Sequence, residues 1–229
     1  MSTVLRAREL VRILPGEVPT TLVNGIDLSI EAGEFVCIMG PSGSGKSSLL
    51  YLLGLLDIPT SGTVELDGID TRGFSDDQLT ATRLAKLGFV FQFHFLLAEF
   101  TVLDNVLLPM RRLGKLSDAA AQARGMQLLD RLGVAEHAHK LPSQLSGGQR
   151  QRIAIARALA NDPLVLLADE PTGNLDTVSS ANVRQILHDL TREMGKSVVA
   201  VTHDPRFAAL ADRRINVVDG RLDPDWQPV

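Results

Sequence analysis

The sequence predicts an α/β fold that combines a parallel core sheet, an N-terminal antiparallel β-subdomain and an inserted helical subdomain. The first observation is a set of continuous apolar runs, the pattern of strands buried on both faces. These runs are residues 35–39, 89–91, 164–168 and 198–202. The second is a set of alternating apolar patterns that suits an antiparallel edge sheet. These patterns lie near residues 3–12, 21–30 and 62–67, with a turn signal at Asp67 and Gly68.

The helical subdomain is predicted from the stretch between the second and third core strands. Within it, residues 116–134 have helical apolar spacing, and Gly133 is expected to end the helix. The expected packing face is Ala120, Ala123, Leu128, Leu129 and Leu132. We therefore expect one domain, residues 1–229. Its core with the antiparallel β-subdomain is predicted at residues 1–92 and 162–229, and the helical subdomain at 93–161.

Composition indicates a soluble globular protein and excludes several classes. The chain of 229 residues is 45% hydrophobic and 22% charged, which leaves no sign of disorder. Its longest apolar stretch, Leu49–Leu56, is far shorter than the roughly 18 residues that cross a bilayer, and no signal-peptide core is visible. A net charge of −4 argues against a nucleic-acid partner. The single cysteine, Cys37, is expected to be a buried hydrophobe, with a reactive thiol as the alternative.

The segment FVCIMGPSGSGKSSLLYLLGLL predicts a strand, a glycine-rich turn and a helix that begins near Lys46. This is the setting that the phosphate-binding P-loop pattern G-x-x-x-x-G-K-[ST] requires. Glycines let backbone N–H groups approach a phosphate, Lys46 adds a cation for the β- and γ-phosphates, and Ser47 offers a hydroxyl to Mg²⁺. A flexible turn without a ligand is the alternative. The predicted nucleotide-binding residues here are Gly40, Pro41, Ser42, Gly43, Ser44, Gly45, Lys46, Ser47 and Ser48.

A second motif, PLVLLADEP, is acidic and supplies the other metal ligand that a P-loop needs. Asp169 lies at the end of a predicted buried strand and is followed by Glu170. Asp169 can hold Mg²⁺, while Glu170 can orient or deprotonate a water, a role worth about 10² to 10⁴-fold in rate. The pair favours hydrolysis over transfer of the phosphoryl group to another substrate.

A histidine follows the last predicted core strand. The segment SVVAVTHD ends with Thr202 and His203 at the carboxyl edge of the sheet, where open parallel sheets bind ligands. A lone histidine is more often structural, but this position favours a contact with the γ-phosphate.

A further glycine motif, LSGGQ, places Ser146, Gly147 and Gly148 before a helix expected from about Gln149 to Ala160. Its first turn would expose free N–H groups and so form a second anion site. LSGGQ, positioned upstream of LLADE, resembles the signature motif of ATP-binding cassette (ABC) ATPases, and this resemblance covers nearly the whole chain.

The resemblance implies further roles. Gln92 in FVFQ matches the Q-loop, a catalytic, nucleotide and Mg²⁺ contact, and Asp176 in PTGNLD matches the D-loop, a nucleotide contact. His203 matches the switch histidine. ATP and Mg²⁺ are the implied ligands, and a second copy is the implied partner in a head-to-tail dimer, where Ser146, Gly147, Gly148 and Gln149 face the nucleotide of the other chain. Ile13 occupies the usual position of an adenine-stacking aromatic residue, which leaves only apolar contact with the base.

The segment FHFLLAEF, Phe93–Phe100, lies where ABC ATPases receive the coupling helix of their transmembrane permease. Its side chains could form a docking groove or pack in the subdomain core, and Phe95, Leu97 and Phe100 are left open between the two. Together with ADEPTGNLD and VTHD, this segment resembles the ATPase subunits of lipoprotein-releasing transporters. These transporters fall within a wider group that also includes macrolide exporters and the cell-division FtsEX complex. The implied location is the cytoplasmic face of the inner membrane.

Three alternatives differ in function. An exporter of drugs or peptides, or an FtsEX-like complex, would share most motifs. A soluble ABC ATPase of DNA repair would interrupt the chain with a long coiled coil, and one of translation would join two cassettes; neither pattern is present. A P-loop kinase is disfavoured by LSGGQ and Glu170.

Overall fold

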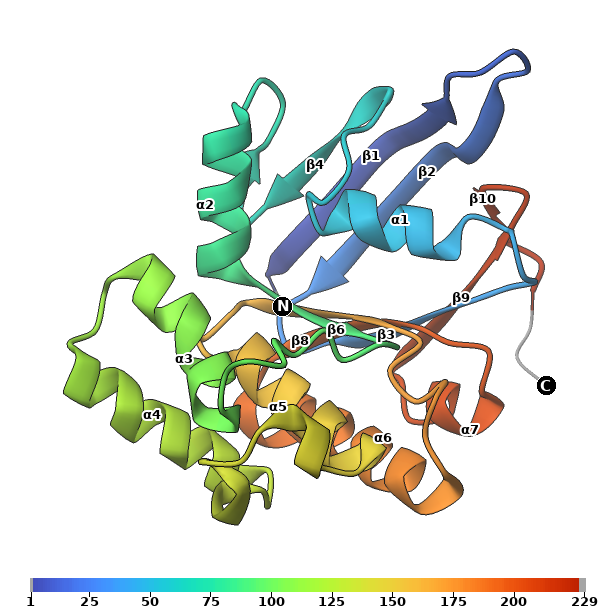
Figure 1. Ribbon diagram of the computed structural model, residues 1–229. Helices are drawn as coiled ribbons and strands as arrows, with labels where there is room; N and C mark the ends of the chain where they lie inside the picture. Colours follow the sequence, from blue (N-terminus) through green and yellow to red (C-terminus); the bar gives the residue numbers. More distant parts are fainter. Residues whose placement is uncertain (1, 227–229) are drawn as a thin grey trace.

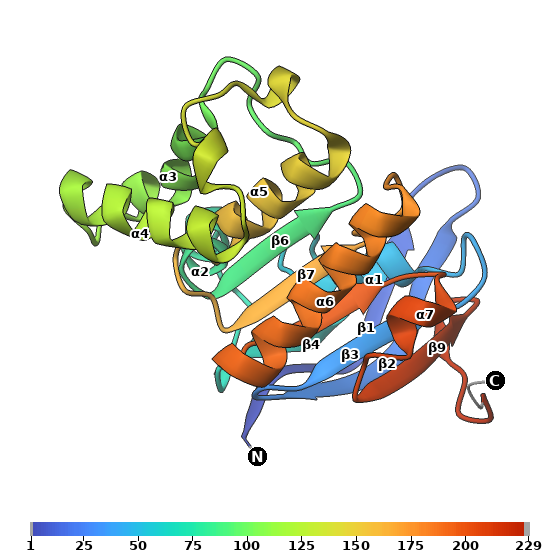
Figure 2. The ribbon, with the colours of Figure 1, turned by 90° about the horizontal axis from the view of Figure 1, so that it is seen from below.

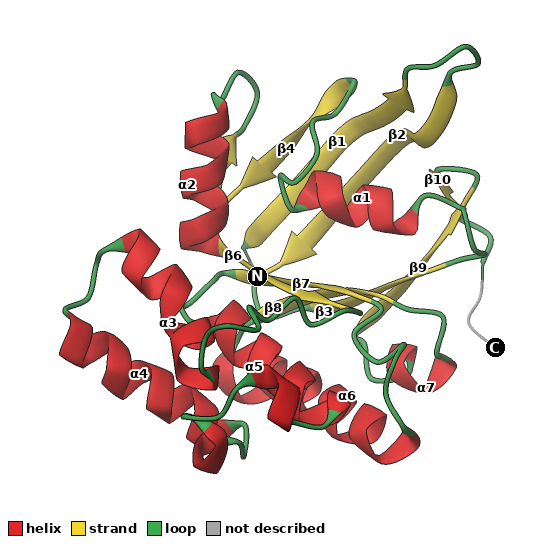
Figure 3. Cartoon of the chain, viewed as in Figure 1, coloured by secondary structure: helices red, strands yellow, loops and turns green. Residues whose placement is uncertain are grey.

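The computed structural model describes residues 2–226, and these form two sheets with helices packed around them. In Figures 1 and 3 the antiparallel sheet lies above the core sheet, which is seen nearly edge-on, and most helices lie below it. The predicted α/β class, with its parallel core sheet and separate antiparallel sheet, is confirmed. The outer limits of the predicted domain, residues 1 and 229, lie outside the described residues.

The antiparallel sheet has the strand order β2-β1-β4-β5. Its strands are β1 (Thr3–Leu14), β2 (Thr20–Glu31), β4 (Ser61–Leu66) and β5 (Ile69–Asp70). The three alternating segments predicted from the sequence correspond to β1, β2 and β4. The two-residue strand β5 pairs with β4 across the turn at Asp67 and Gly68 and is too short for a periodic pattern.

The core sheet has the order β10-β9-β3-β8-β7-β6. The predicted strands are β3 (Phe35–Met39), β6 (Leu87–Phe91), β7 (Val165–Asp169) and β8 (Ser197–Val201), all parallel. Two further strands were not predicted, β9 (Arg213–Val218) and β10 (Arg221–Leu222). β9 joins the sheet edge beside β3, where only part of its length is buried, so it lacks a continuous apolar run.

The continuous apolar strands result from burial on both faces of the core sheet. In β3, Phe35 and Cys37 pack with the helices below, whereas Val36 and Ile38 pack with the antiparallel sheet. Strands β7 and β8 divide their residues in the same alternating way. Both sets of alternate side chains are therefore removed from water, and the strand sequence is hydrophobic throughout.

The helix α1 (Lys46–Leu53) lies between the two sheets, where its leucines contact both (Figure 1). Figure 2, seen from below, shows α5 (Gly147–Leu159), α6 (Thr177–Met194) and α7 (Pro205–Ala208) against the other face of the core sheet. The remaining helices are α2 (Asp76–Lys86), α3 (Val102–Leu113), α4 (Asp118–Arg131) and the 3₁₀ turns η1 (Ala135–His137) and η2 (Pro142–Gln144).

The predicted packing face of α4 was partly wrong. Leu128, Leu129 and Leu132 are buried, but Ala120 and Ala123 are exposed. The N-terminal half of the face is formed instead by Ala121 and Gly125. A Cβ atom at Gly125 would lie 3.0 Å from side-chain atoms of two α3 leucines, Leu103 and Leu107, so the two helices approach closely at this position.

Residues 93–161 contain α3, α4 and α5, and the subdomain boundaries remain a prediction. Within residues 2–226, no helix has the length and apolar character needed to cross a membrane.

Candidate functional site

The loop between β3 and α1 folds around the side chain of Lys46, the first residue of α1. Gly45 has a φ angle of 98°, and a Cβ atom there would lie 2.0 Å from the carbonyl oxygen of Leu22, so only glycine fits. No side chain caps α1 at Gly45, which leaves the first N–H groups of this helix without intrahelical partners. Lys46 Nζ donates to the carbonyl oxygens of Gly40 (2.9 Å) and Pro41 (2.6 Å). A cation and free N–H groups thus lie together, as a phosphate site requires.

The other predicted residues of this loop differ in how far they are buried. Ser42 and Gly43 are exposed, and Ser48 is half-buried in the first turn of α1. Ser44 is buried, and among the described residues its Oγ has no hydrogen-bond partner.

Two hydroxyl groups of α1 meet the carboxylate of Asp169 at the end of β7. Ser47 Oγ donates to Asp169 Oδ1 over 2.9 Å, and Tyr51 OH donates to Asp169 Oδ2 over 2.8 Å. Burial, and then the bond to Asp169, raise the pKa of Tyr51 to about 12, so its hydroxyl remains a donor at neutral pH. Ser47 and Asp169 were predicted together from the sequence as metal ligands, whereas Tyr51 was not predicted. The four-residue spacing of Ser47 and Tyr51 on a predicted helix was the available signal.

The oxygen donors of Ser47 and Asp169 fit Mg²⁺, a hard cation. Across residues 2–226, no group of three or more His, Cys, Asp or Glu side chains could by itself hold a metal. A cation here would therefore take most of its ligands from nucleotide phosphates and water, which is the usual arrangement for Mg²⁺.

Glu170 and His203 form a hydrogen-bonded pair at the carboxyl ends of β7 and β8. His203 Nδ1 lies 2.9 Å from Glu170 Oε1. The imidazole is 76% exposed and the carboxylate 20%, so the acid is sheltered and the histidine faces solvent. Glu170 has a φ angle of 45°, a left-handed conformation that a non-glycine residue adopts at some cost.

Gln92 contacts the segment after Glu170. Its Nε2 donates to Asn174 Oδ1 over 3.0 Å, and Asn174 Nδ2 donates back to the Gln92 carbonyl oxygen over 3.4 Å. Among the described residues, Gln92 makes no hydrogen bond to Ser47 or Asp169. The metal contact implied for Gln92 by family resemblance would require this amide pair to open.

The LSGGQ segment begins a helix two residues earlier than expected. α5 starts at Gly147 with Ser146 as its N-cap, and Ser146 and Gln149 form a reciprocal capping box. Gln149 Nε2 also lies 2.8 Å from His137 Nε2. The serine and glutamine predicted as nucleotide contacts are therefore engaged with each other.

Asp176 is linked to the LSGGQ segment through Ser179. It caps α6 by accepting hydrogen bonds from the N–H of Ser179 (2.9 Å) and its Oγ (2.7 Å), and these bonds lower the pKa of the carboxyl. Ser179 in turn packs on Gly148, where a Cβ atom would lie 2.4 Å from Ser179 Oγ. The signature residues and Asp176 thus form one cluster. In residues 2–226 no hydrogen bond joins this cluster to Lys46, Ser47 or Asp169.

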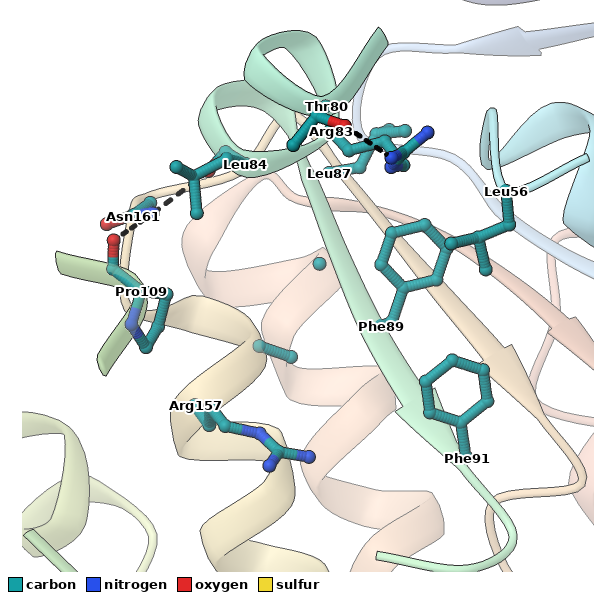
Figure 4. A pocket seen from close by; sticks show the side chains of 12 residues that line it. Leu56, Thr80, Arg83, Leu84, Leu87, Phe89, Phe91, Pro109, Arg157 and Asn161 are labelled. Atoms are coloured by element: carbon teal, nitrogen blue, oxygen red, sulfur yellow. Dashed lines mark hydrogen bonds between the residues drawn. The ribbon is translucent and has the colours of Figure 1, made fainter. Parts of the chain in front are cut away.

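A largely apolar groove of about 370 Å³ lies between α2, β6 and α5, away from the P-loop (Figure 4). It is lined by Leu56, Thr80, Arg83, Leu84, Leu87, Gly88, Phe89, Phe91, Pro109, Arg157, Ala158 and Asn161. Arg157 donates to the carbonyl oxygens of His94 (2.8 Å) and Phe95 (2.6 Å), which ties α5 to the segment after Gln92. Sequence analysis did not identify this groove, because its walls come from segments far apart in the chain.

The three side chains left open between groove and core are exposed: Phe95 is 63%, Leu97 44% and Phe100 40% exposed. Phe93 is also 62% exposed, and we call these four side chains the aromatic patch. Leu96 points the other way and packs against the core. The patch adjoins the groove, because the Phe95 ring packs edge-on against that of Phe91, with centroids 5.5 Å apart.

Ile13, at the expected adenine position, is half-buried in β1 and pairs with Thr21 of β2. The next β2 residue, Leu22, contacts Gly45, so Ile13 lies in the strand pair beside the P-loop.

A family model described as ABC transporter matches residues 23–173. The chain is 52% identical over 90% of its length to a lipoprotein-releasing system ATP-binding protein, LolD 1, from Chlorobium chlorochromatii, of which it covers 84%. It is 46% identical over 97% of its length to LolD from Aquifex aeolicus, of which it covers 97%.

Solved structures with the same fold are ATP-binding cassettes. The dimeric cassette MJ0796 in a post-hydrolysis state bound to ADP and Pi superposes with a TM-score of 0.89 at 41% identity, covering 98% of this chain and 99% of that chain. A second dimeric structure of MJ0796, a bacterial ABC transporter cassette, gives a TM-score of 0.88 at 43% identity, with 96% of each chain covered.

Proposed function

The chain belongs to the ABC transporter family of ATP-binding proteins, and we propose that it is the ATP-hydrolysing subunit of a transporter that releases lipoproteins from the inner membrane. The observation that carries the hydrolytic part is the convergence of a phosphate loop, a hydroxyl–carboxylate pair and an acid–histidine pair. They come from the carboxyl ends of three parallel strands, β3, β7 and β8. The lipoprotein part rests on the similarity to LolD proteins.

In the proposed binding step, the phosphates of ATP occupy the P-loop. The N–H groups at the start of α1 and the Lys46 ammonium supply positive charge there, and Lys46 exchanges its bonds to Gly40 and Pro41 for phosphate oxygens. Ser47 and Asp169 would hold Mg²⁺, which would supply positive charge beside the β- and γ-phosphates.

In the proposed hydrolytic step, Glu170 acts as the general base. Its carboxylate follows the metal ligand Asp169 directly and is sheltered from bulk water, so it can orient a water and accept its proton. His203, which contacts Glu170 in this structure, would turn toward the γ-phosphate when nucleotide is bound. Gln92 would leave Asn174 to reach the same site.

We propose that two copies associate head to tail to complete each site. Ser146, Gly147 and Gly148 lie at the N-terminus of α5, which can bind a phosphate, yet no contact links them to Lys46 among the residues described. A second chain would supply the missing half. Gln149 and Asp176 lie in the same cluster and would contact the nucleotide of the partner.

The proposed permease site is the groove together with the aromatic patch. An amphipathic helix can place apolar side chains in such a groove, and Phe95 connects the two surfaces. Arg157 donates hydrogen bonds to the backbone carbonyls of His94 and Phe95. A helix bound in the groove would therefore contact a residue that is tied to the segment directly after Gln92. The subunit would then lie at the cytoplasmic face of the inner membrane, bound through its permease.

The function is tested by co-purification and reconstitution. Tagged protein is isolated from solubilised native membranes, and bound proteins are identified by mass spectrometry. We expect a permease pair that, in proteoliposomes with this subunit, releases a labelled lipoprotein only when ATP is hydrolysed. Recovery of a permease that releases no lipoprotein would overturn the assignment of lipoproteins as the cargo. Recovery of no membrane protein would overturn the transporter assignment.

A further inference from the structure

Tyr51 occupies a position with a specific relationship to the proposed metal site. Ser47 and Tyr51 are four residues apart on α1, so their side chains lie on one face of the helix. Each hydroxyl donates to a different oxygen of the same carboxylate, Oδ1 and Oδ2 of Asp169. One helix therefore holds the Asp169 carboxylate at two points.

These two hydroxyls are the whole hydrogen-bonding environment of that carboxylate in residues 2–226. Ser47 can bind Mg²⁺ through a lone pair of its oxygen while its O–H still donates to Oδ1. The bond from Tyr51 to Oδ2 is the second protein contact that keeps the carboxylate in one orientation, and it comes from a side chain that is not itself a proposed ligand of the ion.

The backbone of Tyr51 is held in place by the turn after α1. The carbonyl oxygen of Tyr51 accepts hydrogen bonds from the N–H groups of Leu56 (2.9 Å) and Asp57 (3.3 Å) in the turn after α1. The helix is packed between two sheets. The hydroxyl thus reaches Asp169 from a fixed backbone position.

We propose that Tyr51 is a positioning residue of the magnesium site, which orients Asp169 through Oδ2 while Ser47 and Asp169 bind the ion. This inference rests on the proposed function, because it assumes Mg²⁺ at Ser47 and Asp169. In this arrangement Tyr51 acts through Asp169 and is not itself a ligand of the ion. Groups that orient a metal ligand from behind typically change metal affinity by about 10- to 100-fold when removed.

The test is a Tyr51→Phe substitution, which removes the hydroxyl and keeps the ring. Binding of Mn²⁺, as a spectroscopic substitute for Mg²⁺, is measured by electron paramagnetic resonance with a non-hydrolysable ATP analogue present. We expect the metal dissociation constant to rise about tenfold. Affinity for the analogue in EDTA and the melting temperature should be unchanged.

Thr191→Val is the matched control. Thr191 is buried in α6, remote from the site, and donates to a backbone carbonyl, so its substitution also removes one hydroxyl. Metal affinity in this variant should equal that of the wild type.

Three outcomes would overturn the inference. A metal dissociation constant in Tyr51→Phe within twofold of wild type would mean that Tyr51 is only a structural residue. Equal loss of analogue affinity with and without metal would mean general damage to the P-loop. If wild-type protein with the analogue binds no metal, the metal site of the proposed function fails, and this inference fails with it.

A second measurement uses the fact that Tyr51 is the only tyrosine in the chain. Protein labelled with 3-fluorotyrosine should give one ¹⁹F resonance. Asp169→Asn should move that resonance, because the phenol loses a charged acceptor, whereas Glu170→Gln should leave it in place. A resonance whose position is unchanged in Asp169→Asn would contradict the contact on which the inference depends.

Discussion

Glu170 and His203 are joined by a hydrogen bond of 2.9 Å between Oε1 and Nδ1, although 33 residues separate them in the chain. The bond links the carboxyl ends of two neighbouring parallel strands, β7 and β8. In this structure the proposed base and the proposed phosphate-sensing histidine are therefore occupied with each other.

His203→Ala should reduce ATP turnover by about 10² or more, because Glu170 loses its partner and the γ-phosphate loses a contact. ATP affinity should change little, because binding depends mainly on the P-loop. Steady-state kcat and equilibrium binding of ATP separate the two effects. A kcat within threefold of wild type would argue that the pair is only structural.

Glu170→Gln should retain ATP binding and lose turnover by about 10² to 10⁴-fold, because the amide cannot accept a proton from water. With nucleotide bound but not hydrolysed, the head-to-tail dimer should persist. Size-exclusion chromatography with light scattering at saturating MgATP should give the mass of two chains, and the same variant without nucleotide is the control. A monomer under both conditions would contradict the shared site.

Phe95→Ala and Phe100→Ala should weaken the association with the permease while leaving the melting temperature and basal ATPase activity close to wild type, because these rings are 63% and 40% exposed. The measurements are co-purification of the permease and thermal unfolding. Leu107→Ala is the contrasting variant: Leu107 is 1% exposed, and its truncation should cost about 2 to 5 kcal/mol of unfolding free energy. If the Phe variants melt as low as Leu107→Ala, the rings are part of the core.

Cys37 should resist alkylation in the folded protein. Burial raises the pKa of its thiol from 9.0 to about 12, so the reactive thiolate is scarce at pH 8. Labelling by iodoacetamide, followed by mass spectrometry, should be slow until denaturant unfolds the chain. Rapid labelling of the native protein at pH 8 would contradict the buried position.

The raised pKa of Cys37 also predicts that the folded protein loses stability as the pH becomes alkaline. Because the folded pKa lies above the unfolded value, the contribution of Cys37 is fully present below pH 9 and is lost as pH rises from about 9 toward 12. Cys37→Ala should remove this part of the dependence in unfolding titrations, and an unchanged alkaline profile would count against it.

Much of the fold was predictable from the sequence, because burial on both faces leaves a continuous apolar pattern in β3, β7 and β8. Strand β9, next to the edge strand β10, was missed because its residues are only partly buried. Only the N-terminal half of the α4 face was misplaced, since Ala119, Ala120 and Ala121 are the same residue type and only packing in the folded chain leaves Ala121 as the buried one.

The sequence by itself determined the P-loop and the acidic pair, because Gly45, Lys46 and Ser47, like Asp169 and Glu170, are neighbours in the chain whose chemistry depends on local spacing. The tertiary structure alone decided that Tyr51 reaches Asp169 across 118 residues and that Gln92 pairs with Asn174 across 82. It also decided that Phe95 faces solvent while Leu96 packs inward. These features depend on which distant segments come together, and apolar side chains of similar size leave no local pattern that distinguishes a docking surface from a core.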